Sequence, residues 1–133
     1  MAEEVYDVVV IGAGPAGATA AIQLGRKGYQ VALVDRVAFP RFAVCAGWLS
    51  AKVEPLLVEL GLPPRKLLER PFRDVTLYNA DLTKSTKPRF ESSVGYIVDR
   101  ARFDNALANA AVKHGATLFQ GSPVTDVRLN ERS

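Results

Sequence analysis

The chain has 133 residues, 48% of them hydrophobic, and a formal net charge of +3, which allows one domain with its own core and gives little support for nucleic-acid binding. Cys45 is the single cysteine, so an internal disulfide is excluded. No apolar run approaches the roughly 18 residues of a membrane span, and the acidic start MAEEVYDVVV lacks the basic residues of a signal peptide. We therefore expect a cytoplasmic protein.

The first predicted elements are a strand, a turn, a helix and a second strand. Val5–Ile11 is a short run rich in valine, which is typical of a strand buried on both faces of a parallel sheet. Gly12–Gly17 then reads G-x-G-x-x-G. The segment ATAAIQLGRKGY contains good helix formers, and Gly28 is placed to end that helix. The segment YQVALVD predicts a second buried strand, which ends in Asp35.

Each glycine of this turn has its own physical role. Gly12 permits a tight turn, Gly14 lets a pyrophosphate approach the backbone, and Gly17 lets the helix pack close to the strands. The helix N-terminus offers N–H donors and a partial positive charge to a diphosphate. Asp35 follows Gly12 by 23 residues, close to the usual spacing of about 20 for an acid that accepts hydrogen bonds from ribose hydroxyls. The pattern predicts an ADP-containing dinucleotide as ligand; the alternative is a glycine-rich turn that binds nothing.

The segment after the second strand narrows the choice of dinucleotide. An acid at position 35 disfavours the 2′-phosphate of NADP, which leaves FAD or NAD. An NAD domain usually continues into another strand–helix unit, whereas Phe39–Phe42 (FPRF) cannot open a regular helix. The stretch SAKVEPLLVELGL then predicts a helix with Ser50 as its N-cap.

The rest of the chain predicts an insertion and a third strand–helix repeat. A polar turn at Asn79–Asp81 lies between strand-like pieces, and we expect residues 72–98 to form an inserted antiparallel hairpin or meander. Residues 99–115 predict a second long helix. The helix and strand over residues 101–120 would add a third parallel strand to the sheet. Further short strands are predicted at residues 94–98, 116–121 and 123–130.

The chain resembles the FAD-dependent geranylgeranyl reductase-like family, within the superfamily of p-hydroxybenzoate hydroxylase-like flavoproteins, in DVVVIGAGPAGATAA, VALVDR, FPRFAVCAGWLS and YIVDRARFDNALANAAVKHGA. The resemblance implies an α/β fold: a Rossmann-like FAD/NAD(P)-binding domain with a parallel sheet and an inserted antiparallel hairpin or meander. In the family, the later half carries a Gly-Asp motif and a sheet that covers the substrate. Residues 1–133 would therefore be the N-terminal half, which binds the ADP moiety of FAD, with the substrate domain absent and the fold incomplete relative to the family.

The resemblance also implies a set of cofactor-binding residues. Arg100 would face the diphosphate and ribitol of FAD, and the backbone of Val124 would meet the adenine ring. In the family a Cys-Gly-Gly lies near the flavin; here it is Cys45-Ala46-Gly47, and the alternative for Cys45 is a small buried thiol. We assign no catalytic acid or base, and no histidine or cysteine cluster predicts a metal site. The cofactor-binding set is Gly12, Gly14, Pro15, Ala16, Gly17, Asp35, Arg36, Arg41, Cys45, Ala46, Gly47, Arg100 and Val124.

The cofactor then determines the expected chemistry. The resemblance implies a flavin-dependent oxidoreductase in which FAD accepts hydride from NAD(P)H and reduces an isoprenoid double bond, so that the small-molecule substrate is a prenyl lipid met at the membrane periphery. Two alternatives stay open: an FAD-dependent monooxygenase, hydroxylase or halogenase of the same superfamily, and a non-catalytic dinucleotide-binding module. We expect the isolated chain to bind FAD through its ADP part, to self-associate and to lack activity.

Overall fold

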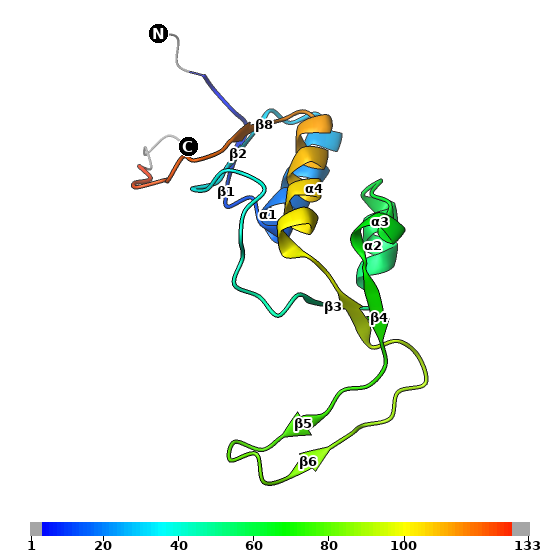
Figure 1. Cartoon of the computed structure of the whole chain (residues 1–133). Coiled ribbons are helices and arrows are strands. Elements are labelled where there is room, and N and C mark those ends of the chain that lie inside the picture. Colours follow the sequence, from blue (N-terminus) through cyan, green and yellow to red (C-terminus); the bar gives the residue numbers. More distant parts are fainter. Residues whose placement is uncertain (1–3, 129–133) are drawn as a thin grey trace. The chain divides into compact units, whose positions relative to one another are not determined.

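The computed structural model of the chain describes residues 4–128, and the chain divides into two compact units (Figure 1). The first unit comprises the residues up to Ala43 and those from Ala101 onward, and the second comprises Val44–Arg100. Among the described residues, no helix combines the length and the apolar character needed to cross a bilayer. The elements of the first unit are β1 (Val8–Ile11), α1 (Pro15–Arg26), β2 (Val31–Val34), β8 (Ala116–Phe119) and, from its second residue, α4 (Arg100–Lys113).

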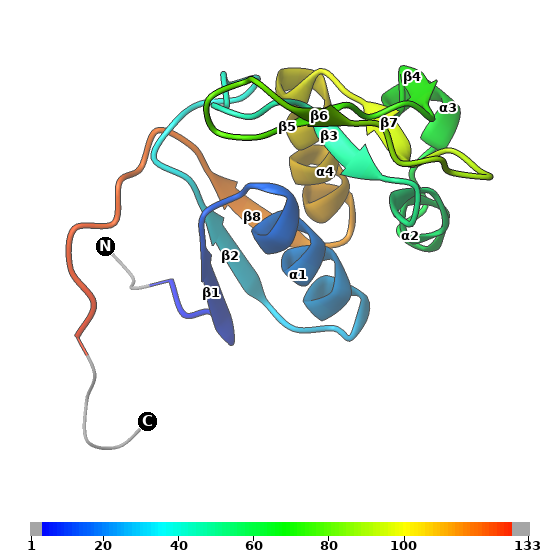
Figure 2. The same cartoon turned by 90° about the horizontal axis from the view of Figure 1, so that it is seen from below.

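The first unit is a three-stranded parallel sheet in the order β1-β2-β8. β1 leads through α1 to β2, and β8 is reached through α4. Both steps move in the same direction along the sheet, so right-handed crossovers place both helices on one face, as Figures 1 and 2 show. The register pairs Val10 with Leu33 and Leu33 with Leu118, so these side chains share a face. The predicted third parallel strand is therefore confirmed.

Two glycines of α1 permit approaches that no other residue would allow. A Cβ at Gly17 would fall on the carbonyl oxygen of Gly12, and a Cβ at Gly25 would fall on the carbonyl oxygen of His114 just after α4. α1 is therefore packed tightly on the end of β1 and against the end of α4. Gly12 itself has φ +96°, a conformation that side chains disfavour, as the predicted tight turn requires.

The sheet face opposite the helices is apolar and exposed. Val9 and Ile11 are 56% and 58% exposed, and the register puts Val34 and Phe119 on the same face. Tyr6 contacts Phe119 edge to face, with 5.9 Å between ring centroids. Within the described residues β1 has a strand neighbour on one side only. An apolar face beside an unpaired strand edge is a surface that favours association.

The second unit is built from short antiparallel strands. The rings of Trp48 and Phe72 meet with 5.3 Å between centroids, and their strands flank Gly95, where a Cβ would collide with the Trp48 indole. The predicted antiparallel insertion is confirmed, and its sheet also uses a strand before residue 72. The strands form a three-stranded sheet β3-β7-β4 and a hairpin β5-β6. Its elements are β3 (Trp48–Ser50), α2 (Val53–Glu59), α3 (Pro64–Leu67), β4 (Arg70–Phe72), β5 (Leu77–Tyr78), β6 (Ser85–Thr86) and β7 (Gly95–Ile97).

The start of α2 differs from the sequence expectation. Ser50 lies in β3, and the N-cap of α2 is Lys52. The Ser50 Oγ accepts a hydrogen bond of 3.2 Å from the N–H of Lys52, which precedes the helix. α2 is tied to the sheet by Tyr96, whose hydroxyl donates a hydrogen bond of 2.6 Å to Glu54. This hydrogen bond raises the pKa of Tyr96, because ionisation would remove the donated proton.

The strand predicted over residues 123–130 is wrong in the part that the structure describes. Residues 123–128 form no strand, while Leu129 and Asn130 lie outside the described residues. The chain turns after β8 at Gly121, which has φ +63°. No described strand lies beside residues 123–128 to accept their backbone hydrogen bonds, so the β-branched residues there do not suffice to form one.

Gly25→Ala should lower the free energy of unfolding by about 2–3 kcal/mol, because the His114 carbonyl can yield only if α1 and α4 separate. Urea unfolding followed by circular dichroism measures this. Gly14→Ala is the matched control: Gly14 has φ −71°, and the nearest atom to a Cβ there is Arg41 Nη2 at 3.4 Å. The control should change stability by less than about 1 kcal/mol. Wild-type stability of Gly25→Ala would contradict the close packing.

Candidate functional site

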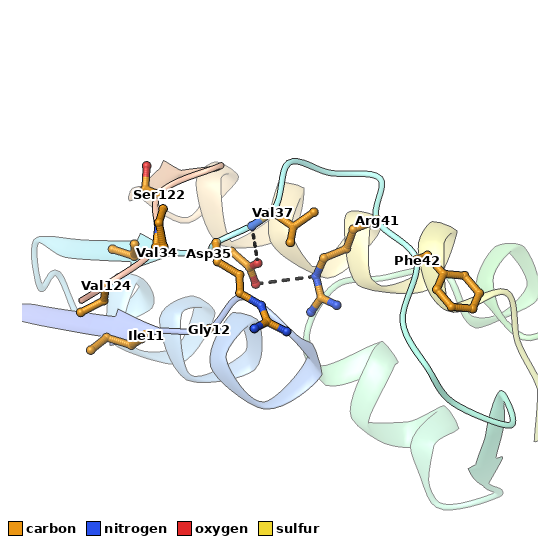
Figure 3. Close-up of a pocket in the computed structure, with 11 residues that line it drawn as sticks. Ile11, Gly12, Val34, Asp35, Val37, Arg41, Phe42, Ser122 and Val124 are labelled. Carbon is orange, nitrogen blue, oxygen red and sulfur yellow. Dashed lines mark hydrogen bonds and ion pairs between the residues drawn. The ribbon is translucent and has the colours of Figure 1, made fainter. Parts of the chain in front are cut away.

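A cavity of about 440 Å³ opens at the carboxyl end of the parallel sheet of the first unit (Figure 3). This volume falls within the range of about 300–1,000 Å³ that is common for small-molecule sites. In open α/β sheets, ligands bind outside the carboxyl ends of the strands, and the cavity lies at that edge. It is lined by the ends of β1 and β2 and by the segments after β2 and β8: Ile11, Gly12, Val34, Asp35, Arg36, Val37, Arg41, Phe42, Ser122, Pro123 and Val124.

Asp35 joins three segments at this edge and is only 6% exposed. Its Oδ2 accepts a hydrogen bond of 2.9 Å from the N–H of Ala13, and its Oδ1 accepts one of 3.0 Å from the N–H of Val37. Its backbone N–H donates to the Phe119 carbonyl at 2.8 Å, and its carbonyl accepts from the Ser122 N–H at 2.9 Å. An ionised carboxylate has about four lone-pair sites, so it can still accept hydrogen bonds from hydroxyl groups.

Arg41 lies between two carboxylates. Its Nε is 3.6 Å from Asp35 Oδ2, and its Nη2 is 3.6 Å from Asp104 Oδ2. Figure 3 shows the Asp35 and Arg41 side chains pointing toward each other. The guanidinium carbon also lies 5.2 Å from the centroid of the Phe39 ring, within cation–π range. Arg41 Nε is buried and makes no hydrogen bond to the described residues.

The glycine turn presents the start of α1 to the same edge. Gly14 is the N-cap and Pro15 stands in the first turn, which contains no acidic residue and no side-chain cap. A helix N-terminus of this kind attracts an anion. The position that a Gly14 Cβ would occupy is 3.4 Å from Arg41 Nη2. A positive charge therefore stands beside the glycine turn.

The structure gathers the predicted residues of the first unit at this edge. Gly12, Asp35, Arg36, Arg41 and Val124 line the cavity. The remaining predicted residues of the turn follow Gly12 directly and begin α1: Gly14, Pro15, Ala16 and Gly17.

Four predicted residues belong to the second unit: Cys45, Ala46, Gly47 and Arg100. Cys45 is exposed, so the alternative of a buried thiol is wrong. Its Sγ accepts a hydrogen bond of 3.4 Å from the N–H of Gly47. Gly47 has φ +73°, and a Cβ there would lie 2.7 Å from the Val98 carbonyl oxygen, so this position requires glycine. Arg100 is the first residue of α4.

Sequence reasoning missed several residues at the site, among them Val37, Ser122 and Asp104. Val37 and Ser122 contribute backbone N–H groups, which any residue type except proline supplies, so the side chains gave no signal. The sequence does contain a signal for Asp104, because this residue precedes Leu107 and Ala108 by three and four residues. All three are buried on α4. An acid on the apolar stripe of a helix marks a buried charge that needs a partner.

A parallel sheet, a glycine turn, an open helix N-terminus and an acid at the end of the second strand together define a dinucleotide-binding α/β unit. Comparison with known sequences then gives the family. The family described as FAD dependent oxidoreductase matches residues 7–133, and the chain belongs to this family. The expected Rossmann-like α/β fold and the expected flavoprotein family are thus confirmed.

Three relatives show how much of such proteins the chain represents. The uncharacterized protein in the nifH2 5′ region of Methanosarcina barkeri is 37% identical over 134 residues, covering 94% of this chain and 70% of that protein. A geranylgeranyl bacteriochlorophyll reductase-like protein from Thermoplasma acidophilum superposes with a TM-score of 0.82 at 26% identity, covering 96% of this chain and 33% of that one. The myxobacterial chondrochloren halogenase superposes with a TM-score of 0.79 at 28% identity, covering 97% of this chain and 31% of that one. The chain spans about a third of these two solved relatives.

Gly14→Val should abolish ADP binding and leave the chain folded. The valine side chain would stand where a diphosphate approaches the backbone. The fold should tolerate it, because the backbone conformation suits valine and the nearest atom to a Cβ there, Arg41 Nη2, is 3.4 Å away. Isothermal titration with ADP measures the binding, and circular dichroism checks the fold.

Ala20→Val is the matched control for this variant, because it enlarges an exposed side chain on the same helix. The control should bind ADP as the wild type does. Unchanged affinity of Gly14→Val would show that the turn has a structural role only.

Proposed function

We propose that the first unit binds the ADP part of FAD. The observation that carries this proposal is the 2.9 Å hydrogen bond from Ala13 to Asp35, because it closes the end of β2 onto the glycine turn. Asp35 would then accept hydrogen bonds from the ribose hydroxyls, and the turn over Gly12–Gly17 would donate backbone N–H groups to the diphosphate. Val124, which also lines the cavity, would face the adenine.

Basic residues would supply charge for the diphosphate. Arg41 is the best placed, because its Nη2 stands beside Gly14 and its Nε makes no hydrogen bond to the described residues. Arg36 lines the same cavity. The proposed contacts of Arg100 and of Cys45–Gly47 with FAD rest on the family resemblance alone.

We propose that the chain serves as the FAD-binding part of a reductase that acts on isoprenoid double bonds. Bound FAD would supply hydride transfer, from NAD(P)H as donor to a prenyl-lipid substrate. Support comes from the reductase-like Thermoplasma protein, which superposes with a TM-score of 0.82. The structurally similar halogenase, with a TM-score of 0.79, supports oxygen-dependent flavin chemistry as the second candidate function. Turnover of NAD(P)H with a prenyl substrate, against turnover with a halide and an aromatic acceptor, separates the two when assayed on the whole protein.

The isolated chain is proposed to bind without turnover. The residues gathered at the cavity of the first unit suit adenosine and diphosphate, and none of them is placed as a general acid or base for a reduction. A prenyl-lipid substrate would bring the protein to the surface of a membrane. We also propose that the protein is cytoplasmic, a location with which its single cysteine is consistent.

Titration of the chain with FAD, ADP, NAD and NADP tests the choice of cofactor. ADP and FAD should bind with similar affinity, and NADP should bind at least about tenfold more weakly, because its 2′-phosphate would meet the Asp35 carboxylate. Asp35→Asn removes the charge of the carboxylate and should reduce the difference in affinity between NADP and the other two ligands, ADP and FAD. An absorbance spectrum of the purified chain, with mass identification of any released ligand, tests FAD directly. Tighter binding of NADP than of ADP or FAD would overturn the assignment.

We further propose that two copies of the chain associate through the exposed face of the β1-β2-β8 sheet. Val9 lies on this face and is 56% exposed. Val9→Lys should give a monomer in gel filtration with light scattering, because lysine adds charge beside the unpaired strand edge. Val58→Lys, at a valine of α2 that is 63% exposed, is the matched control and should leave the dimer intact. A monomeric wild-type chain would refute this association.

A further inference from the structure

We propose that Asp104 is a positioning residue of the nucleotide site. It would hold the Arg41 guanidinium beside the glycine turn, so that the cation is in place before a diphosphate arrives. This inference rests on the proposed function of the first unit and adds to it a residue outside the cavity lining.

The burial of Asp104 is the first observation. Its side chain is fully buried on α4, with 0% exposure. An ionised carboxylate in such a position needs a compensating cation. Arg41 Nη2, at 3.6 Å from Asp104 Oδ2, provides one. Because Asp104 has no exposed surface, it acts on a ligand through Arg41 and not by contact.

The orientation of Arg41 is the second observation. The nitrogen that faces Asp104 is Nη2, and the same nitrogen is 3.4 Å from the place of a Gly14 Cβ. Nε, which neighbours Nη2 on the same edge of the guanidinium, is 3.6 Å from Asp35 Oδ2. A planar guanidinium can span two acids in this way, whereas the single ammonium group of a lysine cannot. Asp104 thus holds the Nη2 group of Arg41 beside the turn.

The loop after β2 makes such a positioning group necessary. Arg41 lies on a segment beyond the end of β2, and its side chain retains 18% exposure. Without the buried anion on α4, the ordering of this long side chain would depend on Asp35 and on the ring of Phe39. A preformed cation loses less conformational entropy on binding than a mobile one. Asp104 would therefore increase affinity for the diphosphate and not for the adenosine.

Titration of the 133-residue chain with ADP and with adenosine tests this distinction. Asp104→Asn should weaken ADP binding by about 10- to 100-fold and change adenosine binding by less than about twofold. Asp104→Glu keeps the charge and should restore part of the ADP affinity. In an Arg41→Met background, Asp104→Asn should have no further effect on ADP. If Asp104 had a purely structural role, Asp104→Asn would weaken the binding of ADP and of adenosine together, and it would do so in the Arg41→Met background as well. That result would overturn the proposal.

Arg41→Lys covers the case in which Asp104→Asn does not fold. It keeps the positive charge, and it should weaken ADP binding by the same factor and leave adenosine binding unchanged, because lysine cannot bridge the two acids. ADP binding at wild-type strength by Arg41→Lys or Asp104→Asn would overturn this inference alone. Failure of the wild-type chain to bind ADP would overturn the proposed function, and this inference with it.

Discussion

The contact between α1 and the end of β1 is the constraint on which the site depends. Because Gly17 has no Cβ, α1 can settle on the carbonyl oxygen of Gly12. The helix N-terminus is thereby fixed at the end of the strand, where the N–H of Ala13 reaches the Asp35 carboxylate at 2.9 Å. A side chain at position 17 would lift the helix and displace the turn, the helix N-terminus and the acid from one another.

Parallel pairing then brings distant parts of the chain to the same edge. β8 pairs with β2, and the segment after it is held by backbone hydrogen bonds, from Asp35 to Phe119 and from Ser122 to Asp35. The Phe39 N–H also donates to Gln120 Oε1 at 2.7 Å, across 81 positions of sequence. The cavity is therefore a product of strand order.

The core of this site could be predicted from local sequence patterns, whereas the contacts between residues far apart in the sequence could not. The glycine spacing, the valine runs and Asp35 each act on their immediate neighbours, so the turn, the first helix and the parallel strands could be predicted from sequence. The prediction of Ser50 as an N-cap was wrong because Ser50 belongs to a three-residue strand. The formation of such a short strand depends on a partner strand far along the chain. The link from Arg41 to Asp104 joins two elements that are separated in sequence by the whole second unit. Only the packing of α4 brings them together.

If ADP is recognised by backbone geometry as proposed, the likeness of this chain to both a reductase-like protein and a halogenase has a physical reason. Glycine N–H groups, a helix N-terminus and one acid recognise phosphate and ribose, and none of them takes part in electron transfer. Selection for a different reaction can therefore leave this corner unchanged. In the proposed flavoprotein, the reaction would then be decided by groups near the isoalloxazine, and the family resemblance alone suggests Cys45-Ala46-Gly47 for that place. Gly47 is required there by its backbone, so an effect of this segment on the reaction would come from Cys45, which is exposed, or from the methyl group of Ala46.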